Sequence, residues 1–211
     1  VLAKGKKVYL YVLIQLYKLC GNFADWHATN SSWTDDHIKS MWGKCRVTKI
    51  YPPCDTSDIM DKVPLETPRK NILVSFAQFR PEKQHDLQLA IWKESLLSLP
   101  RDAKFVMVGA VRGREDELLV EKLRQQAEIL GIKDTVEFMI NRSREDILKL
   151  FAESKVAIHT MKEEHFGISI VEMMSAGLIT IAHDSAGPKM DIIGGAEYPV
   201  GYLASDEGSY R

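Results

Sequence analysis

The fold is decided by residues 71–109, which read NILVSFAQFRPEKQHDLQLAIWKESLLSLPRDAKFVMVG. Two short apolar runs, at 72–77 and 105–109, have the length and composition of buried strands. Between them, apolar residues recur at helical spacing over 86–99, and Pro100 ends the pattern. A strand, a helix and a second strand in this order predict two parallel strands joined by a helical crossover.

The same alternation continues to residue 182. Helical patterns follow at 115–130, 143–151 and 168–176, and short apolar runs follow at 136–138, 156–158 and 178–182. We therefore predict an α/β fold with a doubly wound parallel sheet, whose ligands bind at the carboxyl ends of the strands. Residues 55–70, which include Pro64 and Pro68, are expected to form a surface loop.

The first quarter of the chain differs in charge from the rest. Residues 1–54 carry eight Lys or Arg and three Asp, whereas the remainder carries 20 basic and 26 acidic residues. The apolar stretch at 9–19 (YLYVLIQLYKL) predicts a helix that is too short to span a bilayer. We expect this helix to pack on protein; a position at a membrane surface is the alternative, because lysines precede it. A short helix through Trp42 and a strand at 47–51 are expected next.

Several classes of function are excluded by what the chain lacks. Its composition, 45% hydrophobic and 27% charged with a net charge of −1, is typical of a globular protein and predicts no nucleic-acid partner. Cys20, Cys45 and Cys54 have no metal-ligand spacing, and their odd number favours free thiols in a reducing compartment. The chain contains no GxGxxG fingerprint, P-loop, GxSxG elbow or HExxH pair.

Two cations follow the strand at 72–77. Arg80 and Lys83 are three residues apart, where a turn opens into a helix, so both side chains are expected over the same strand end. Arg as a fork and Lys as a point charge suit a diphosphate. Taken alone, this pair is better explained as a surface loop with salt bridges.

The segment 159–172 combines a helix start with two carboxylates. Gly167 permits a close backbone approach there, and the N–H groups of Phe166, Gly167 and Ile168 are expected to point at an anionic ligand. Glu164 precedes this turn, and a carboxylate at such a position can anchor sugar hydroxyls. Glu172 lies within the helix, among neighbours that leave little polar surface near it; an exposed helix residue is the alternative interpretation.

These residues carry a resemblance. The segment from Glu164 to Glu172, EHFGISIVE, is similar to the E-x7-E motif of family 4 retaining glycosyltransferases, which have the two-domain GT-B fold. Arg80 and Lys83 match the phosphate-binding pair of that family. Further stretches resemble the α-1,2-mannosyltransferases that extend the lipid-linked oligosaccharide of asparagine-linked glycosylation: NSSWT at 30–34, YPPC at 51–54, AQFRPEKQH at 77–85 and IAHDSAGPK at 181–189.

The resemblance implies GDP-mannose as the donor substrate and a dolichol-diphosphate oligosaccharide as the acceptor, at the cytosolic face of the endoplasmic reticulum membrane. It implies retention at the sugar carbon, with no metal or other cofactor. Glu164, Arg80 and Lys83 would be the catalytic residues, the cations neutralising the leaving diphosphate and Glu164 holding mannose. Glu172 would hold the ribose. The donor-binding residues implied in this way are Arg80, Lys83, Phe138, Asn141, Glu164, Phe166, Gly167, Ile168 and Glu172, with Phe138 and Asn141 beside the guanine.

The resemblance also implies a division of the chain. Residues 1–45 would be the end of an N-terminal acceptor-side domain, and 46–211 a donor-binding Rossmann-like domain cut short at its C-terminus. The family's membrane anchor lies in its N-terminal region, which we expect to be largely missing. We therefore expect the isolated chain to be inactive or very weakly active. The alternative is a non-catalytic nucleotide-sugar-binding or interaction fragment that associates with other mannosyltransferases of the pathway.

Overall fold

The chain divides between Pro52 and Pro53 into two compact units, in a computed structural model that describes residues 4–43 and 46–210. This division lies later than the expected boundary after residue 45. The reason is that β2 (Val47–Lys49) pairs in parallel with β1 (His27–Thr29) and so belongs to the first unit. Cys45 lies outside the described residues, and Cys20 and Cys54 are free thiols.

The first unit contains two helices beside this strand pair. The predicted N-terminal helix is confirmed as α1 (Lys4–Gly21), and its large apolar side chains from Val8 to Leu19 are mostly exposed. The second helix, α2 (Ser32–Trp42), begins where the Ser31 hydroxyl accepts a hydrogen bond from the N–H of Thr34. No helix among the described residues is long and apolar enough to cross a membrane.

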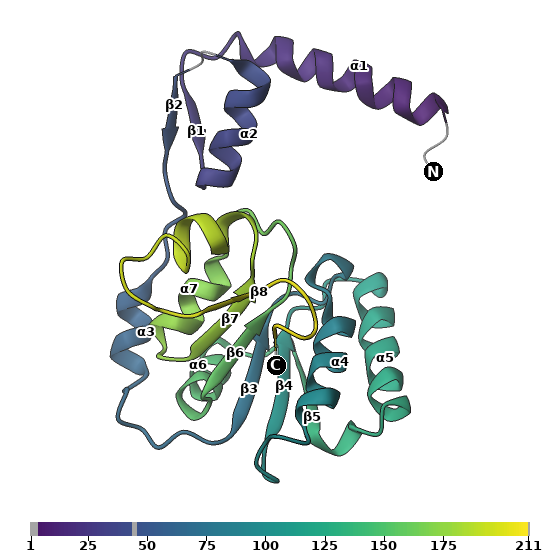
Figure 1. The fold of residues 1–211 in the computed structure, drawn as a ribbon, viewed down its shortest axis with the longest axis vertical. Coiled ribbons are helices and arrows are strands. Elements are labelled where there is room, and N and C mark those ends of the chain that lie inside the picture. The colour runs from purple at the N-terminus through teal and green to yellow at the C-terminus, as the bar shows by residue number, and fades with distance from the viewer. Residues whose placement is uncertain (1–3, 44–45, 211) are drawn as a thin grey trace. The chain divides into compact units, whose positions relative to one another are not determined.

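The second unit is built on a six-stranded parallel sheet in the order β5-β4-β3-β6-β7-β8 (Figure 1). Its strands are β3 (Ile72–Phe76), β4 (Lys104–Gly109), β5 (Val136–Ile140), β6 (Val156–His159), β7 (Ile179–His183) and β8 (Tyr202–Ala204). The predicted doubly wound sheet is thereby confirmed, together with its five predicted strands. The sixth strand, β8, was not predicted.

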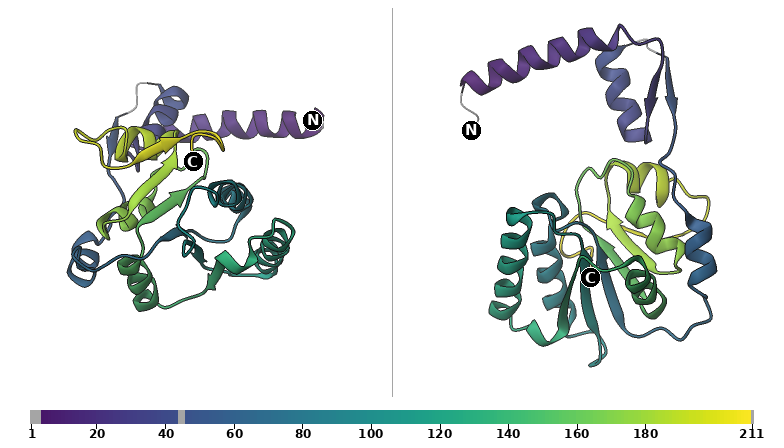
Figure 2. Two further views of the ribbon diagram at one scale, coloured as in Figure 1. Left: turned by 60° about the horizontal axis from the view of Figure 1, so that its bottom comes forward. Right: turned by 180° about the vertical axis from the view of Figure 1, so that it is seen from behind.

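Helices cover both faces of this sheet. They are α3 (Thr56–Lys62), α4 (His85–Ser95), α5 (Arg114–Ile129), α6 (Arg144–Glu153) and α7 (Ile168–Ser175), with short helices η1 (Pro81–Lys83), η2 (Lys133–Thr135) and η3 (Pro188–Ile192). The pairs of views in Figures 1 and 2 place α4 and α5 on one face and α3, α6 and α7 on the other. The buried strand β4 alternates accordingly: Phe105 and Met107 pack with α4 and α5, and Val106 and Val108 with the opposite helices.

The prediction of a surface loop over 55–70 was wrong. The Asp55 carboxylate caps α3 by accepting a hydrogen bond from the N–H of Asp58. Ile59 and Val63, one turn apart, are buried in the core beneath the sheet. Further along, the guanidinium of Arg69 donates to backbone carbonyls at the ends of α6 and α7. The segment is therefore an anchored part of the domain.

The boundaries of the other helices follow their capping residues. Gly131, at a φ of 69°, follows the end of α5 as predicted. Ser143 forms a capping box with Asp146 at the start of α6. The helix predicted over 86–99 ends earlier, at Ser95, and Leu97 beyond it is 94% exposed. The Leu97 side chain is therefore not packed in the core, and no burial there stabilises a further helical turn.

Candidate functional site

The site lies at the point in the sheet where successive strands change from being added on one side of β3 to being added on the other. The chain builds β3, β4 and β5 outward in one direction, and then returns so that β6 pairs with β3 on its other side. The loops that follow β3 and β6 therefore leave the sheet in opposite directions at its carboxyl edge. Open α/β sheets bind ligands in the crevice at such a point. The first of these loops carries Arg80 and Lys83, and the second carries Glu164.

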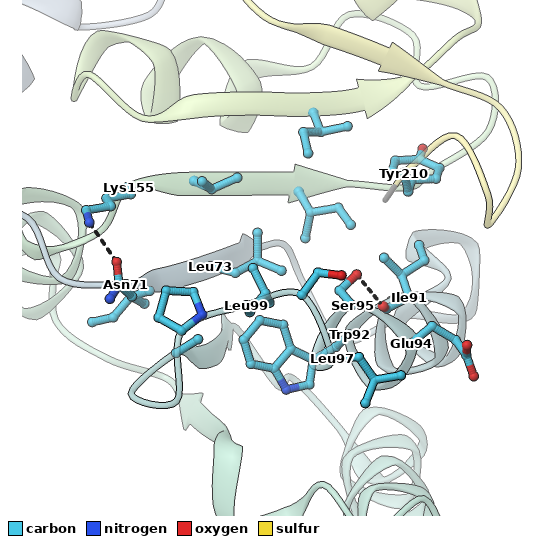
Figure 3. A pocket seen from close by; sticks show the side chains of 17 residues that line it. Asn71, Leu73, Ile91, Trp92, Glu94, Ser95, Leu97, Leu99, Lys155 and Tyr210 are labelled. Atoms are coloured by element: carbon cyan, nitrogen blue, oxygen red, sulfur yellow. Dashed lines mark hydrogen bonds between the residues drawn. The ribbon is translucent and has the colours of Figure 1, made fainter.

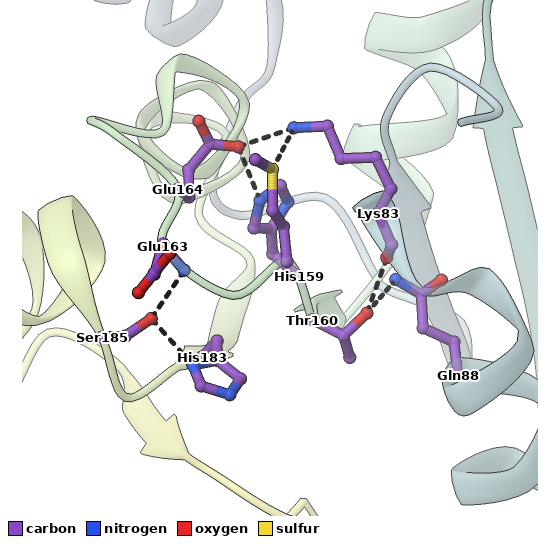
Figure 4. Close-up of polar contacts among 9 residues, drawn as sticks. Lys83, Gln88, His159, Thr160, Glu163, Glu164, His183 and Ser185 are labelled. Carbon is purple, nitrogen blue, oxygen red and sulfur yellow. Dashed lines mark hydrogen bonds and ion pairs between the residues drawn. The ribbon is translucent and has the colours of Figure 1, made fainter. Parts of the chain in front are cut away.

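An ion pair joins the two loops. Lys83 Nζ lies 2.6 Å from Glu164 Oε2, and the same oxygen lies 3.1 Å from His159 Nε2 (Figure 4). Lys83 Nζ also contacts the Met161 sulfur at 3.1 Å. The side chains of Lys83 and Glu164 are both largely shielded from solvent, being 19% and 16% exposed. The two residues, 81 positions apart in the chain, thus form one charged centre.

The backbone of Lys83 is fixed by Thr160. The Thr160 hydroxyl, just past the end of β6, donates to the carbonyl of Lys83 at 2.9 Å, and it accepts a hydrogen bond from Gln88 Nε2 on α4. Gln84, the next residue after Lys83, adopts a left-handed conformation with a φ of 52°. The turn therefore aims the lysine at the crevice, whereas α4 runs away from it.

Burial and neighbouring charges act in opposite senses on Glu164. Desolvation raises the pKa of its carboxyl group, but hydrogen bonds from His159 and Lys83, with the lysine charge, outweigh it and hold the pKa at about 2. Desolvation dominates at His159 and lowers the pKa of its ring. At neutral pH Glu164 is therefore ionised and His159 is uncharged.

The N-terminus of α7, with backbone N–H groups that donate no hydrogen bond to a described residue, lies next to this centre. Gly167 precedes α7 at a φ of 111°, a conformation that side-chain-bearing residues rarely adopt. Throughout the described part of the chain, no hydrogen bond is donated by the N–H of Gly167 or of Ile168. Arg80 is half-buried and makes no side-chain hydrogen bond or ion pair with another described residue. Phe166 is buried. The predicted donors of Gly167, Ile168 and Arg80 thus remain available to an anion.

A third loop braces the second one. The Ser185 hydroxyl accepts a hydrogen bond from the N–H of Glu163 and contacts His183 Nδ1, both at 2.9 Å. The N–H of Gly187 donates to the carbonyl of Glu164, and a Cβ at Gly187 would lie 2.4 Å from the carbonyl oxygen of His165. Only a glycine lets the two loops approach so closely. The loop after β7 therefore holds the main chain of Glu164 in place.

Glu172 is held by a residue that the sequence analysis did not select. On α7, its Oε1 lies 2.8 Å from an amino group of Arg144, the first residue of α6. Its side chain is 19% exposed, so the alternative of an exposed helix residue does not fit. Burial, and after it the negative charge of Glu172, raise the pKa of the Cys54 thiol. Glu172 thus presents a partly shielded carboxylate with one oxygen already engaged.

Phe138 and Asn141 lie farther along the sheet, on β5 and just after it. The Phe138 ring packs near Phe79, and the guanidinium of Arg124 lies 4.9 Å from its centre. The Asn141 amide bonds to both the N–H and the carbonyl of Val111, which joins the loops after β4 and β5. Both side chains therefore have structural partners, and their place beside a base stays a prediction.

Sequence reasoning missed three contributors: His159, Thr160 and Arg144. His159 was considered only as a metal ligand, and Thr160 and Arg144 carry no motif. Their roles depend on which strands are neighbours, and the signal that could have indicated them was their position directly after a buried strand or at a helix start.

A separate apolar pocket of about 600 Å³ lies away from these residues (Figure 3). It lies between α4 and the sheet face of β3, β6 and β7, and Tyr210 and Leu99 line it. Its polar groups are few, and Lys155 among them is bonded to Asn71. It shares no lining residue with the charged centre.

Comparisons with known proteins agree with this geometry. The model of the family "Glycosyl transferases group 1" matches residues 57–209, and that of "ALG11 mannosyltransferase N-terminus" matches residues 1–42. The chain is 40% identical over 219 residues to the human GDP-Man:Man(3)GlcNAc(2)-PP-Dol alpha-1,2-mannosyltransferase, and 39% identical over 212 residues to the Dictyostelium discoideum protein of the same name. These alignments cover 99% and 95% of this chain but 44% and 42% of those relatives, so it spans less than half their length.

Solved structures support the fold. Anabaena HepE in complex with UDP and glucose has a TM-score of 0.72 at 22% identity, covering 92% of this chain and 53% of that one. The sucrose-phosphate synthase of Thermosynechococcus elongatus has a TM-score of 0.74 at 16% identity, covering 93% and 50%. The fold, the paired loops at the point where strand succession reverses and the match over 57–209 lead to one conclusion: this chain belongs to the group 1 glycosyl transferase family.

Proposed function

We propose that this chain is the donor-binding part of a retaining α-1,2-mannosyltransferase that transfers mannose from GDP-mannose to a dolichol-diphosphate oligosaccharide. The observation that carries the proposal is the charged centre of Lys83 and Glu164, to which His159 is hydrogen-bonded, beside the uncommitted N–H donors at the start of α7. The names of the relatives supply the donor and the acceptor.

In this proposal the diphosphate lies between Arg80, Lys83 and the N–H groups of Gly167 and Ile168. The bond between the mannose anomeric carbon and the phosphate oxygen breaks, negative charge grows on that oxygen, and the acceptor hydroxyl takes its place on the carbon. Fixed donors and cations stabilise that charge where it develops, and they do so most effectively in a partly shielded site. The acceptor proton passes to the departing phosphate.

Glu164 then holds the mannose hydroxyls, and Glu172 holds the ribose. An ionised carboxylate accepts hydrogen bonds only, which suits hydroxyl donors. The low pKa of Glu164 keeps it ionised throughout the physiological range. We place this reaction at the cytosolic face of the endoplasmic reticulum membrane, as the resemblance of the sequence implies.

A second candidate function is binding of the nucleotide sugar without transfer. It requires only the groups that the described residues bring together here: the Lys83–Glu164 pair and the N–H groups at the start of α7. Both candidates require a donor site, and they differ in whether radiolabelled mannose reaches a dolichol-diphosphate oligosaccharide. Transfer by the isolated chain at a normal rate would exclude the binding-only candidate.

Calorimetric titration with GDP and GDP-mannose tests the donor site. Lys83→Ala should weaken GDP binding about 10- to 100-fold, because a hydrogen bond to a charged group contributes about 1.5–3 kcal/mol. Glu172→Ala should weaken it less, since a ribose hydroxyl is neutral. Lys70→Ala is the matched control for Lys83→Ala, because Lys70 also pairs with a glutamate, Glu153, outside the site. A wild-type chain that fails to bind GDP at millimolar concentration would exclude both candidates.

A further inference from the structure

The two carboxylate oxygens of Glu164 have different surroundings. Oε2 receives both Lys83 Nζ and His159 Nε2, at 2.6 and 3.1 Å. Oε1 receives no hydrogen bond from any described residue, and Figure 4 shows it directed away from both partners. One oxygen is thus fixed by the protein, and the other is left for a ligand.

His159 is the more rigid of the two partners. It is the last residue of β6, it is 2% exposed, and the neighbouring strand β7 pairs with it at Ala182. Lys83, in contrast, carries its ammonium group on a flexible four-carbon stem from a loop. The His159 side chain therefore holds the carboxylate from a fixed position and does not move with a bound ligand.

The protonation states determine the direction of this hydrogen bond. An ionised carboxylate can only accept, so the contact at 3.1 Å requires that His159 Nε2 carries the proton. Burial lowers the pKa of the ring, which leaves it uncharged at neutral pH. His159 thus contributes a neutral N–H donor and adds no charge that would compete with Lys83 for an anion.

Donor binding changes what each partner does. The Lys83 ammonium has three donor hydrogens and can turn toward a diphosphate, and this weakens its hold on Glu164. His159 stays in place and keeps Oε2 engaged, so that Oε1 still faces the site. The sugar is then bound by a carboxylate whose orientation does not depend on the lysine.

We propose that His159 is a positioning residue for the sugar of the donor, which orients Glu164 through the bond from Nε2 to Oε2. This inference rests on the proposed function, since it assumes that Glu164 contacts the sugar and not the nucleotide. It predicts that loss of the Nε2–H group of His159 weakens binding of GDP-mannose and leaves binding of GDP nearly unchanged.

The test measures the affinities of the full 211-residue chain for GDP and GDP-mannose by calorimetry. His159→Leu should weaken GDP-mannose binding about five- to tenfold and GDP binding less than twofold. The loss is smaller than that of a direct hydrogen bond to a charged group, because His159 acts on the sugar through Glu164. His159→Gln, whose amide N–H can replace Nε2–H, should recover most of the lost affinity. In a Glu164→Gln background, His159→Leu should cause no further loss.

Two calorimetric outcomes would overturn the inference alone: an equal loss of both affinities in His159→Leu, which indicates a structural role, or no loss of either. A wild-type chain that binds neither compound would overturn the proposed function, and this inference with it. Because His159→Leu could unfold the domain, ring ¹⁵N NMR of the wild type gives an independent test. The neutral Nε2–H tautomer is expected, with a larger shift on adding GDP-mannose than on adding GDP; an Nδ1–H tautomer would contradict the inference.

Discussion

The buried His85 should make this domain less stable in mild acid. Desolvation, together with the nearby His159 and Lys83, lowers the pKa of His85 from 6.5 to about 4. As the pH falls from 6.5 to 4, the unfolded chain takes up a proton that the folded chain does not, so stability is lost over that range. A shift of this size corresponds to about 3 kcal/mol. We expect the free energy of unfolding of the second unit to fall by at least that amount.

Urea denaturation at several pH values, followed through the NMR signals of β4, measures this loss. His85→Phe, which can keep the stacking on Phe79 seen at 5.0 Å, should reduce the loss by about 3 kcal/mol. His37→Phe is the matched control, because His37 is exposed and lies in the first unit. An unchanged pH dependence in His85→Phe would show that other groups govern acid sensitivity.

Individual site residues could be predicted where their chemistry shows in the local sequence. Lys83 stands just before the start of α4, Glu164 stands just before the glycine at the start of α7, and the structure brings the two side chains into contact. The ion pair of Glu172 with Arg144 could not be predicted, because 28 residues separate them and nothing in either segment indicates that the first residue of α6 reaches the Glu172 carboxylate on α7. The local sequence pattern can indicate a charged site residue, but its ion-pair partner depends on the tertiary structure.

The helix α3 makes a prediction at the level of elements. Ile59 is fully buried in the core formed with α6 and α7, whereas the next residue, Met60, is 61% exposed. Ile59→Ala should destabilise the second unit by about 2–5 kcal/mol, because it removes transfer energy and leaves a cavity. Met60→Ala, a truncation of similar size in the same helix, should change stability by less than about 0.5 kcal/mol. Chemical denaturation compares the two variants, and similar effects would indicate that α3 is not packed as described.

The elements that the sequence did not predict are short or carry mixed polarity. α3 has seven residues between prolines and charged groups, too few for a helical period to stand out. β1 and β8 have three residues each, and the backbone bonds that define them come from a partner strand. The longer helices, α5 above all, show their period and their capping residues directly. Whether these short elements form depends on tertiary contacts, which the local sequence does not show.

At the scale of the molecule, alternation of strands and helices was enough to predict a parallel sheet but not its strand order. That order determines the site, because it makes β6 a neighbour of β3 and so joins loops 81 residues apart. The compact units divide between Pro52 and Pro53, later than the boundary expected after residue 45, because the pairing of β2 with β1 assigns residues 47–49 to the first unit.

This division gives a prediction for the whole chain. Every residue that we assign to the donor site, from Arg80 to Glu172, lies in the second unit, and so does every partner that positions them. A chain that begins at Pro53 should therefore fold and bind GDP within about twofold of the affinity of the 211-residue chain. Paired calorimetric titrations test this, with Lys83→Ala in the shorter chain as the control for a specific site. An affinity more than tenfold weaker, in a shorter chain that is shown to be folded, would mean that residues 1–52 contribute to the donor site.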